Sequence, residues 1–119
     1  MSPTLVLKDG RPYLSIGTPG ATRIISALPQ IMMNIIDHQM NIQEAIDAPR
    51  IYCMTGEIAM ESRIPKEARQ ALIHRGHKLS VRKDFDLYFG GAQGVLIDPR
   101  TGTLYGGADP RRDGFAAGY

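Results

Sequence analysis

Short apolar runs separated by turn residues open the chain. Residues 4–7 and 12–16 are mainly apolar, and the Asp9-Gly10 pair between them is typical of the two-residue turn that joins antiparallel strands. The pattern therefore predicts a β-hairpin, followed by a loop of glycine and proline at residues 17–20.

The next segment repeats apolar residues at helical spacing. One stripe runs along residues 24–40, and further isoleucines and methionines widen it to almost the whole circumference. This pattern predicts a helix that is buried on nearly all sides and packs against a sheet. Pro29 lies inside the segment and cannot donate a backbone hydrogen bond, so we expect a kink or a short break there.

Two shorter helices and further strands follow. Asn41 as the N-cap and Glu44 three positions later predict a helix that ends before Pro49. Another helix is expected from Pro65 to Gly76. An extended segment is expected at residues 51–54 and strands at residues 57–61, 78–82, 92–98 and 103–105, whereas residues 106–119 are too rich in glycine and charge for regular structure.

Together these elements predict an α+β fold. Hairpins at both ends, with two or three helices in the chain between them, are typical of a largely antiparallel sheet covered by helices. No repeat or linker divides residues 1–119, so we expect a single domain. The edges of its sheet would lie open if the chain stood alone.

Composition excludes several classes of protein. The chain has 119 residues, 43% of them hydrophobic and 22% charged, which is ordinary for a globular domain and atypical of a disordered or fibrous protein. No apolar run approaches the roughly 18 residues that span a bilayer, so no membrane contact is expected. The net charge is +2, the basic residues are scattered along the chain and aromatic residues are few, so nucleic acid is not an expected partner. The first residues lack a signal-peptide pattern, and the compartment is left open.

Few residues outside the loops are candidates for chemistry. Cys53 is the only cysteine, and no Cys/His spacing matches a zinc site, so neither a disulfide nor a bound metal is predicted. His38 is interpreted as a structural residue, and His74 and His77 as residues at a helix end. No Ser, Thr or Cys stands in a motif with a base, so the residues alone indicate no nucleophile.

The charged group near the C-terminus allows two interpretations. It is either a turn that pairs its own charges or a clamp for a substrate carboxylate, and it consists of Asp109, Arg111, Arg112 and Asp113.

The loop at residues 17–22 joins the end of a strand to the start of the apolar helix. The first N–H groups of a helix are unpaired and lie at the positive end of its dipole, where an anion or a developing oxyanion is stabilised. Gly17 and Gly20 would let a ligand approach the backbone closely. The loop is therefore a candidate anion site, with a plain connecting turn as the alternative.

Five blocks, in order along the chain, resemble the end of the small subunit of γ-glutamyltranspeptidases. They are Met1-Ser2-Pro3-Thr4, Gly17-Thr18-Pro19-Gly20, residues 40–50, Gly76-His77, and residues 109–114 together with Gly118-Tyr119. The resemblance implies an N-terminal-nucleophile hydrolase fold, a four-layer αββα sandwich, in which a precursor cleaves itself to expose a threonine. It further implies that this threonine attacks the γ-glutamyl amide of glutathione or a related compound, without a metal or an organic cofactor.

The resemblance also assigns roles to the loop. The oxyanion hole of the family maps onto the backbone N–H groups of Gly20 and Ala21, and Thr18 and Pro19 belong to the same substrate-binding loop. Ala21 stands where the family has a second glycine, and a positive φ there would strain alanine. The threonine nucleophile and the residues that hold the substrate's α-amino group would lie upstream of Met1, so this chain by itself is expected to be inactive.

Two functions remain open on the sequence. The chain is the C-terminal segment of a γ-glutamyl acyltransferase or hydrolase that needs the upstream region or the large subunit as its partner. Alternatively, it is a non-catalytic remnant of the same fold that self-associates or binds an anion.

Overall fold

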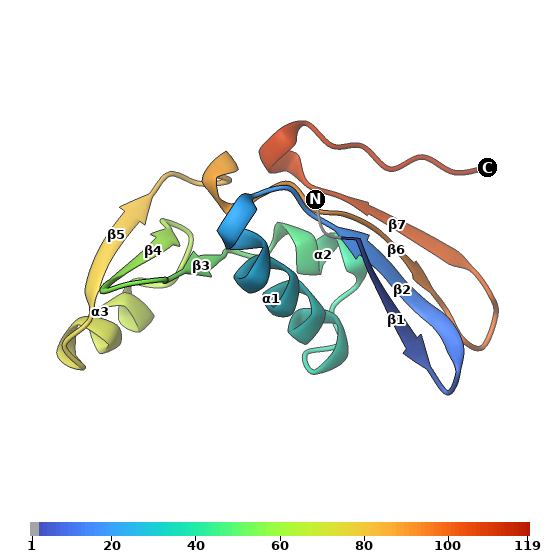
Figure 1. Ribbon diagram of the computed structural model, residues 1–119, viewed down its shortest axis with the longest axis horizontal. Coiled ribbons are helices and arrows are strands. Elements are labelled where there is room, and N and C mark those ends of the chain that lie inside the picture. Colours follow the sequence, from blue (N-terminus) through green and yellow to red (C-terminus); the bar gives the residue numbers. More distant parts are fainter. Residues whose placement is uncertain (1–2) are drawn as a thin grey trace.

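The computed structural model describes residues 3–119, which form two β-sheets and three α-helices (Figure 1). Met1 and Ser2, half of the first family-like block, lie outside the described residues. The molecule is elongated, with extents of 46 × 28 × 23 Å and a radius of gyration of 15.1 Å. A compact domain of this length would have a radius of gyration of roughly 13.5 Å, so part of the surface that a closed domain would bury is open.

The larger sheet joins two hairpins in the order β1-β2-β6-β7, and all of its pairs are antiparallel. Asp9 and Gly10 both have positive φ, as the predicted two-residue hairpin turn requires, so the first hairpin is confirmed. The second hairpin is also confirmed. The strands are β1 (Thr4–Lys8), β2 (Arg11–Gly17), β6 (Gln93–Ile97) and β7 (Leu104–Ala108).

The smaller sheet has the order β3-β4-β5 and was not foreseen as a separate sheet. Its strands are β3 (Ile51–Tyr52), β4 (Glu57–Glu61) and β5 (Lys78–Arg82). β4 and β5 are parallel, because the helix α3 (Lys66–His74) carries the chain back to the start of the sheet before β5 begins. The α+β class with three helices and mostly antiparallel sheets is therefore confirmed, with one parallel pair added.

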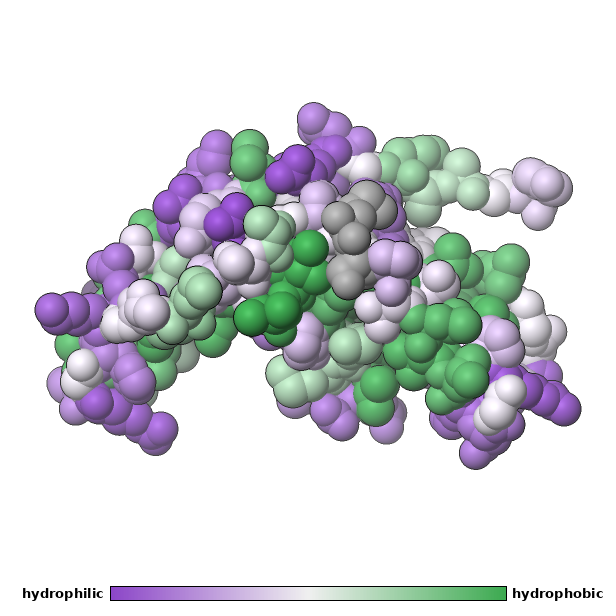
Figure 2. Space-filling view, viewed as in Figure 1, coloured by the Kyte–Doolittle hydropathy of each residue, from purple (hydrophilic) through white to green (hydrophobic). Residues whose placement is uncertain are grey.

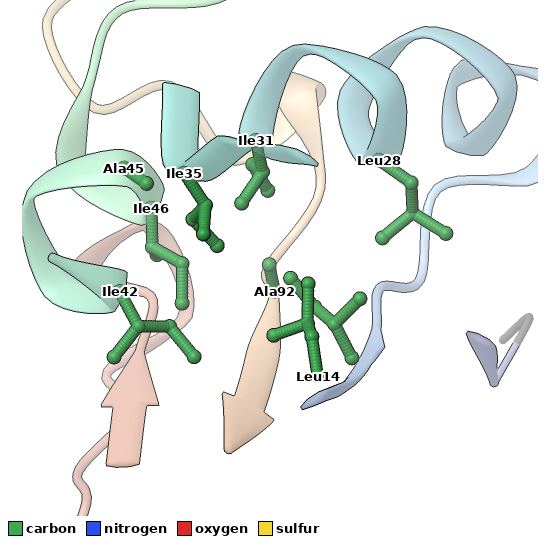
Figure 3. Close-up of a cluster of buried hydrophobic side chains, with 9 residues drawn as sticks. Leu14, Leu28, Ile31, Ile35, Ile42, Ala45, Ile46 and Ala92 are labelled. Atoms are coloured by element: carbon green, nitrogen blue, oxygen red, sulfur yellow. The ribbon is translucent and has the colours of Figure 1, made fainter. Parts of the chain in front are cut away.

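Helices α1 (Ile24–Ile36) and α2 (Ile42–Asp47) cover one face of the larger sheet. Figure 3 shows the buried aliphatic side chains that join the two helices to β2 and to the residue before β6. The predicted capping box of α2 is present, because Asn41 Oδ1 accepts from the amide of Glu44 at 2.9 Å and Glu44 Oε2 accepts from the amide of Asn41 at 3.1 Å.

The expectation that the first helix is buried on nearly all sides is wrong. The sheet lies on one side of α1, so Leu28 and Ile31 are buried, whereas the side chain of Ile25 is 74% exposed and Ile36 is also exposed. Helix α1 is unbroken at Pro29, so the expected short break is absent. Pro29 is exposed, so water can reach the carbonyl of Ile25 that the missing amide would have bonded.

The glycine-rich residues after Tyr105 are partly regular, contrary to the sequence-based expectation. Strand β7 continues through Gly106 and Gly107 to Ala108. A Cβ atom at Gly107 would lie 2.8 Å from Ile46 Cδ1 and 2.9 Å from Ile42 Cγ1. The absence of a side chain at Gly107 therefore lets α2 pack directly on the strand.

The other face of the larger sheet carries exposed apolar side chains. The register pairs Leu5 with Ser15 and Ser15 with Val95, so the three form one row on the face opposite the helices. Leu5 is 61% exposed, and Val95 and Leu104 are also exposed. Figure 2 shows apolar residues at the surface over α1 and β1. The helices thus leave this face open apart from the C-terminal segment, where Ala116 lies over Gly106.

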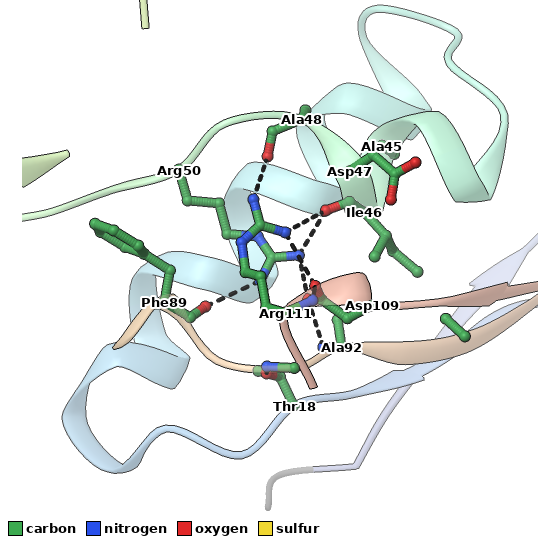
Figure 4. A network of polar contacts seen from close by, with 12 residues as sticks. Thr18, Ala45, Ile46, Asp47, Ala48, Arg50, Phe89, Ala92, Asp109 and Arg111 are labelled. Carbon is green, nitrogen blue, oxygen red and sulfur yellow. Dashed lines mark hydrogen bonds and ion pairs between the residues drawn. The ribbon is translucent and has the colours of Figure 1, made fainter. Parts of the chain in front are cut away.

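A buried group of charged side chains joins the two sheets, and we call it the ion hub: Arg50, Glu61, Asp109 and Arg111. Arg111 forms a two-pronged pair with Glu61, with Nε–Oε1 at 2.6 Å and Nη2–Oε2 at 2.8 Å. It also bonds Asp109 at 3.1 Å, and Arg50 pairs with the other oxygen of Asp109 at 2.8 Å. Figure 4 shows Arg50, Asp109 and Arg111 between the end of α2 and the turn that follows β7.

The ion hub also satisfies backbone groups that would otherwise be buried without a partner. Arg50 and Arg111 both donate to the carbonyl of Ile46 at the end of α2, at 2.7 and 2.9 Å. Arg50 donates to the carbonyl of Phe89 at 2.9 Å, and Asp109 accepts from the amide of Ala92 at 2.8 Å. The two guanidinium groups thus lie at the negative end of the α2 dipole. The segment before β6 is hydrogen-bonded to Arg50 and to Asp109.

Burial and ion pairing shift the pKa values of the two arginines in opposite directions. Burial lowers the pKa of Arg50 more than the adjacent carboxylate of Asp109 raises it. Burial also acts to lower the pKa of Arg111, but its hydrogen bonds to Glu61 and the charge of Asp109 outweigh burial, so this pKa is raised. Arg111 pairs with two carboxylates, Glu61 and Asp109, whereas Arg50 pairs with Asp109 alone.

Removing the charge of Glu61 tests the importance of the ion hub. Glu61→Gln leaves the buried guanidinium of Arg111 with only one of its two carboxylates and should lower the free energy of unfolding by roughly 3–5 kcal/mol. Glu57→Gln, at the exposed start of the same strand, is the control and should change it by less than about 0.5 kcal/mol. Urea unfolding followed by circular dichroism measures both, and equal midpoints for the two variants would contradict a stabilising hub.

Candidate functional site

The candidate site is the corner at Thr18–Ala21, which follows β2 and leads through a 3₁₀ turn (Ala21–Arg23) into α1. Gly20 has φ 144° and Ala21 has φ 51°. The positive φ of Ala21 costs an L-residue roughly 1–2 kcal/mol. The chain thus turns sharply at two consecutive residues and holds one of them in a strained conformation.

Two adjacent amides at this corner are free. Gly20 is half-buried and Ala21 is exposed. Among residues 3–119, neither N–H donates a hydrogen bond, and the first bond of the turn runs from the amide of Arg23 to the carbonyl of Gly20 at 3.0 Å. Unpaired amides at the start of a helix favour a negatively charged partner. The corner can therefore receive an anionic oxygen.

The segment before β6 packs against the corner and forms a hydrogen bond to it. Thr18 is fully buried, and its hydroxyl donates to the carbonyl of Pro19 at 2.9 Å and accepts from the amide of Gly91 at 3.0 Å. A Cβ atom at Gly90 would lie 2.5 Å from Thr18 Oγ1. Thr18 thus holds the corner in place, and the prediction that Thr18 and Pro19 contact a substrate stays a prediction.

Aromatic and cationic side chains flank the corner, and sequence reasoning missed them. The guanidinium carbon of Arg23 lies 4.3 Å from the ring centroid of Tyr88, and the hydroxyl of Tyr52 bonds Thr22 Oγ1 at 2.9 Å. These residues come from three separate segments and form no motif, so no local pattern could have brought them together. Only the position of Arg23 directly after the glycine loop could have suggested it.

Neither hydroxyl near the corner is activated within the described residues. Thr18 is bonded to backbone groups, and Thr22 is bonded to Tyr52. Neither contacts a histidine or a carboxylate in residues 3–119, so this part of the protein offers charge stabilisation without an attacking group.

The other sequence candidates lie away from the corner or inside the fold. Asp109 and Arg111 belong to the buried ion hub, so they pair internally, although with partners far away in sequence. Their neighbours Arg112 and Asp113 are exposed, as are the three histidines. In residues 3–119 no cluster of His, Cys, Asp or Glu is arranged to hold a metal ion, and no helix is long and apolar enough to cross a membrane.

Comparison with known proteins gives a consistent result. The family model for gamma-glutamyltranspeptidase matches residues 1–119. The chain is 43% identical over 114 residues to the acylase ACY 1 proenzyme of Pseudomonas sp. (strain SE83), covering 96% of this chain and 20% of the relative. It is 36% identical over 122 residues to the glutathione hydrolase proenzyme of Escherichia coli (strain K12), covering 100% of this chain and 20% of the relative.

A solved structure agrees with these matches. Cephalosporin acylase from Bacillus halodurans superposes with a TM-score of 0.92 at 37% identity, over 98% of this chain and 22% of that one. The chain spans about a fifth of the length of these relatives. Since the family model covers every residue and the backbone follows that of a solved relative, the chain belongs to the gamma-glutamyltranspeptidase family.

Proposed function

We propose that this chain supplies the oxyanion hole of an amide-cleaving acyltransferase or hydrolase, with the N–H groups of Gly20 and Ala21 as its two donors. The observation that carries the proposal is the free state of these amides at a corner of positive φ, directly before α1. Donors fixed before the reaction need no reorganisation when charge develops, which is how an oxyanion hole accelerates acyl transfer.

In the proposed reaction, a threonine from a segment outside these 119 residues attacks the amide carbonyl. The carbonyl oxygen becomes negatively charged and accepts hydrogen bonds from both corner amides. The intermediate then expels the amine, which takes up the proton that the threonine hydroxyl gave up, and leaves an ester on the threonine. Water or an amine acceptor breaks the ester and regenerates the threonine.

The open face of the larger sheet fits a second layer of the fold. Its exposed apolar row, including Leu5 and Val95, would be buried by a second sheet in an αββα sandwich of the N-terminal-nucleophile type. The helix layer formed by α1 and α2 already covers the other face. The chain would thus act as the C-terminal part of a small subunit, completed by the upstream region or the large subunit.

Two substrate classes are proposed. The glutathione hydrolase relative favours γ-glutamyl amides such as glutathione. The acylase relative shares more identity, 43% against 36%, and favours other amide-linked acyl donors. In the alternative, non-catalytic function the chain would self-associate through its open sheet face.

A chimera tests the proposed function. In it, this chain replaces the matching segment of the ACY 1 proenzyme, and the release of 4-nitroaniline from glutaryl and γ-glutamyl anilides is measured. The chimera should cleave at least one anilide, and the 119-residue chain alone should cleave neither, because it lacks the attacking group. A folded chimera without activity, together with a chain that forms stable oligomers, would support the non-catalytic alternative instead.

Substitutions at Ala21 test the strained donor. Ala21→Gly relieves the positive-φ strain but makes the unfolded chain more flexible, so the free energy of unfolding should rise by a net of about 0.5–1 kcal/mol. Its kcat in the chimera should equal or exceed that of Ala21, since the amide keeps its direction. Ala21→Val is the contrasting variant, because a β-branched residue disfavours positive φ. It should lower both the free energy of unfolding and kcat. Thermal unfolding and anilide assays give the two values; a less stable glycine variant would refute the strain.

A further inference from the structure

A cationic cluster outside the ion hub lies beside the corner. Arg23 places its guanidinium carbon 4.3 Å from the ring centroid of Tyr88, and Arg82 places its own 4.1 Å from the same ring. Arg82 is paired with Asp86 at 3.1 Å. Two guanidinium groups therefore lie against the ring of Tyr88, but only one of them is paired with a carboxylate.

The uncompensated charge belongs to Arg23. Within residues 3–119 Arg23 forms no ion pair, and its Nε is buried without a hydrogen-bond partner. In the same range, Arg50, Arg63 and Arg69 also have an Nε without a partner, so Arg23 is set apart by stacking on a ring without forming an ion pair. A guanidinium without a counter-ion favours a bound anion at its free edge. By contrast, the guanidinium of Arg111 donates to two carboxylates and two carbonyls.

The ring that braces Arg23 is itself fixed. The amide of Tyr88 donates to Asp86 Oδ1 at 2.9 Å, and its ring packs edge-on against Tyr52 and Phe89, with centroids 6.2 and 5.2 Å apart. A guanidinium stacked on an aromatic ring keeps its edge free and loses little further freedom on binding. A planar guanidinium edge matches a carboxylate with two parallel hydrogen bonds.

Arg23 is also close to the two proposed oxyanion donors. Its amide bonds the carbonyl of Gly20 at 3.0 Å, and a Cβ atom at Gly20 would lie 3.7 Å from Arg23 Cβ. Ala21 is two residues away on the same 3₁₀ turn. The backbone and Cβ of Arg23 therefore lie next to the position proposed for the carbonyl oxygen of the substrate.

We propose that Arg23, braced by Tyr88, binds a carboxylate of the amide substrate and is a specificity-determining residue of the site. This inference rests on the proposed function of the corner. The carboxylate stands either on the acyl part of the substrate or on the amine leaving group, because both parts of an amide extend from the carbonyl at the corner.

The test compares two matched pairs of anilides on the chimera. In the first pair, γ-glutamyl-3-carboxy-4-nitroanilide and γ-glutamyl-4-nitroanilide differ in a carboxylate on the leaving group. In the second, glutaryl-4-nitroanilide and its terminal carboxamide differ in a carboxylate on the acyl group. Within one pair, Arg23→Gln should lower kcat/KM for the member with the additional carboxylate by roughly 10- to 100-fold more than for its partner, mainly through KM. The affected pair identifies the source of the carboxylate.

Two variants serve as controls. Arg23→Lys keeps the charge without the planar edge and should recover part of the lost selectivity. Arg100→Gln removes the same charge from an exposed side chain in the β6–β7 turn and should leave both pairs unchanged. An equal loss on both members of every pair, or no loss on any, would overturn the role of Arg23.

Binding separates this inference from the proposed function. If the chimera cleaves no anilide, the proposed function fails, and calorimetric titration with the two products, glutarate and 5-amino-2-nitrobenzoate, still tests Arg23. Weaker binding of one product to Arg23→Gln than to Arg100→Gln would support a carboxylate site. Equal binding to the two variants, or no binding to the unsubstituted chimera, would refute it.

Discussion

The buried pairing of Arg111 with Glu61 is the constraint on which the rest of the structure depends. It joins the turn after β7 to the end of β4, and so holds the two sheets together. Charges at this depth are tolerated only when nearly every donor finds an acceptor, which is why carbonyls at the end of α2 are drawn into the same group. Through Arg50 the ion hub also holds the carbonyl of Phe89, directly before the glycines that pack behind Thr18. The position of the candidate site therefore depends on charged residues that are distant from it in sequence.

The two faces of the larger sheet differ in how they are covered. Helices α1 and α2 close one face of the larger sheet, while the other face keeps an exposed apolar row and the molecule stays elongated. At the junction of the two sheets, the corner presents free amides, with an uncompensated Arg23 beside them. The chain thus has the means to stabilise negative charge and an unfilled surface on which further polypeptide could pack. Both features agree with a family member that spans about a fifth of its relatives' length.

The sequence predicted the features that depend on interactions between residues close together in the chain. The Asp9-Gly10 turn, the capping box of Asn41 and both strands of the smaller sheet's parallel pair follow from turn, cap and alternation patterns. The parallel pairing itself, the strand through Gly107 and the one-sided burial of α1 depend on contacts between distant segments, so no local pattern encodes them. The corner was suggested by its glycines and by family resemblance, whereas its flanking Arg23 and Tyr88 meet only in three dimensions.

The proposed role of the amides of Gly20 and Ala21 is to stabilise the oxyanion. The most direct measurement is a crystal structure of the chimera with a tetrahedral inhibitor adduct on its threonine. The account predicts that the adduct's anionic oxygen lies within about 3 Å of both nitrogens. An oxygen held by other donors, or corner amides bonded to carbonyls of the protein, would contradict it.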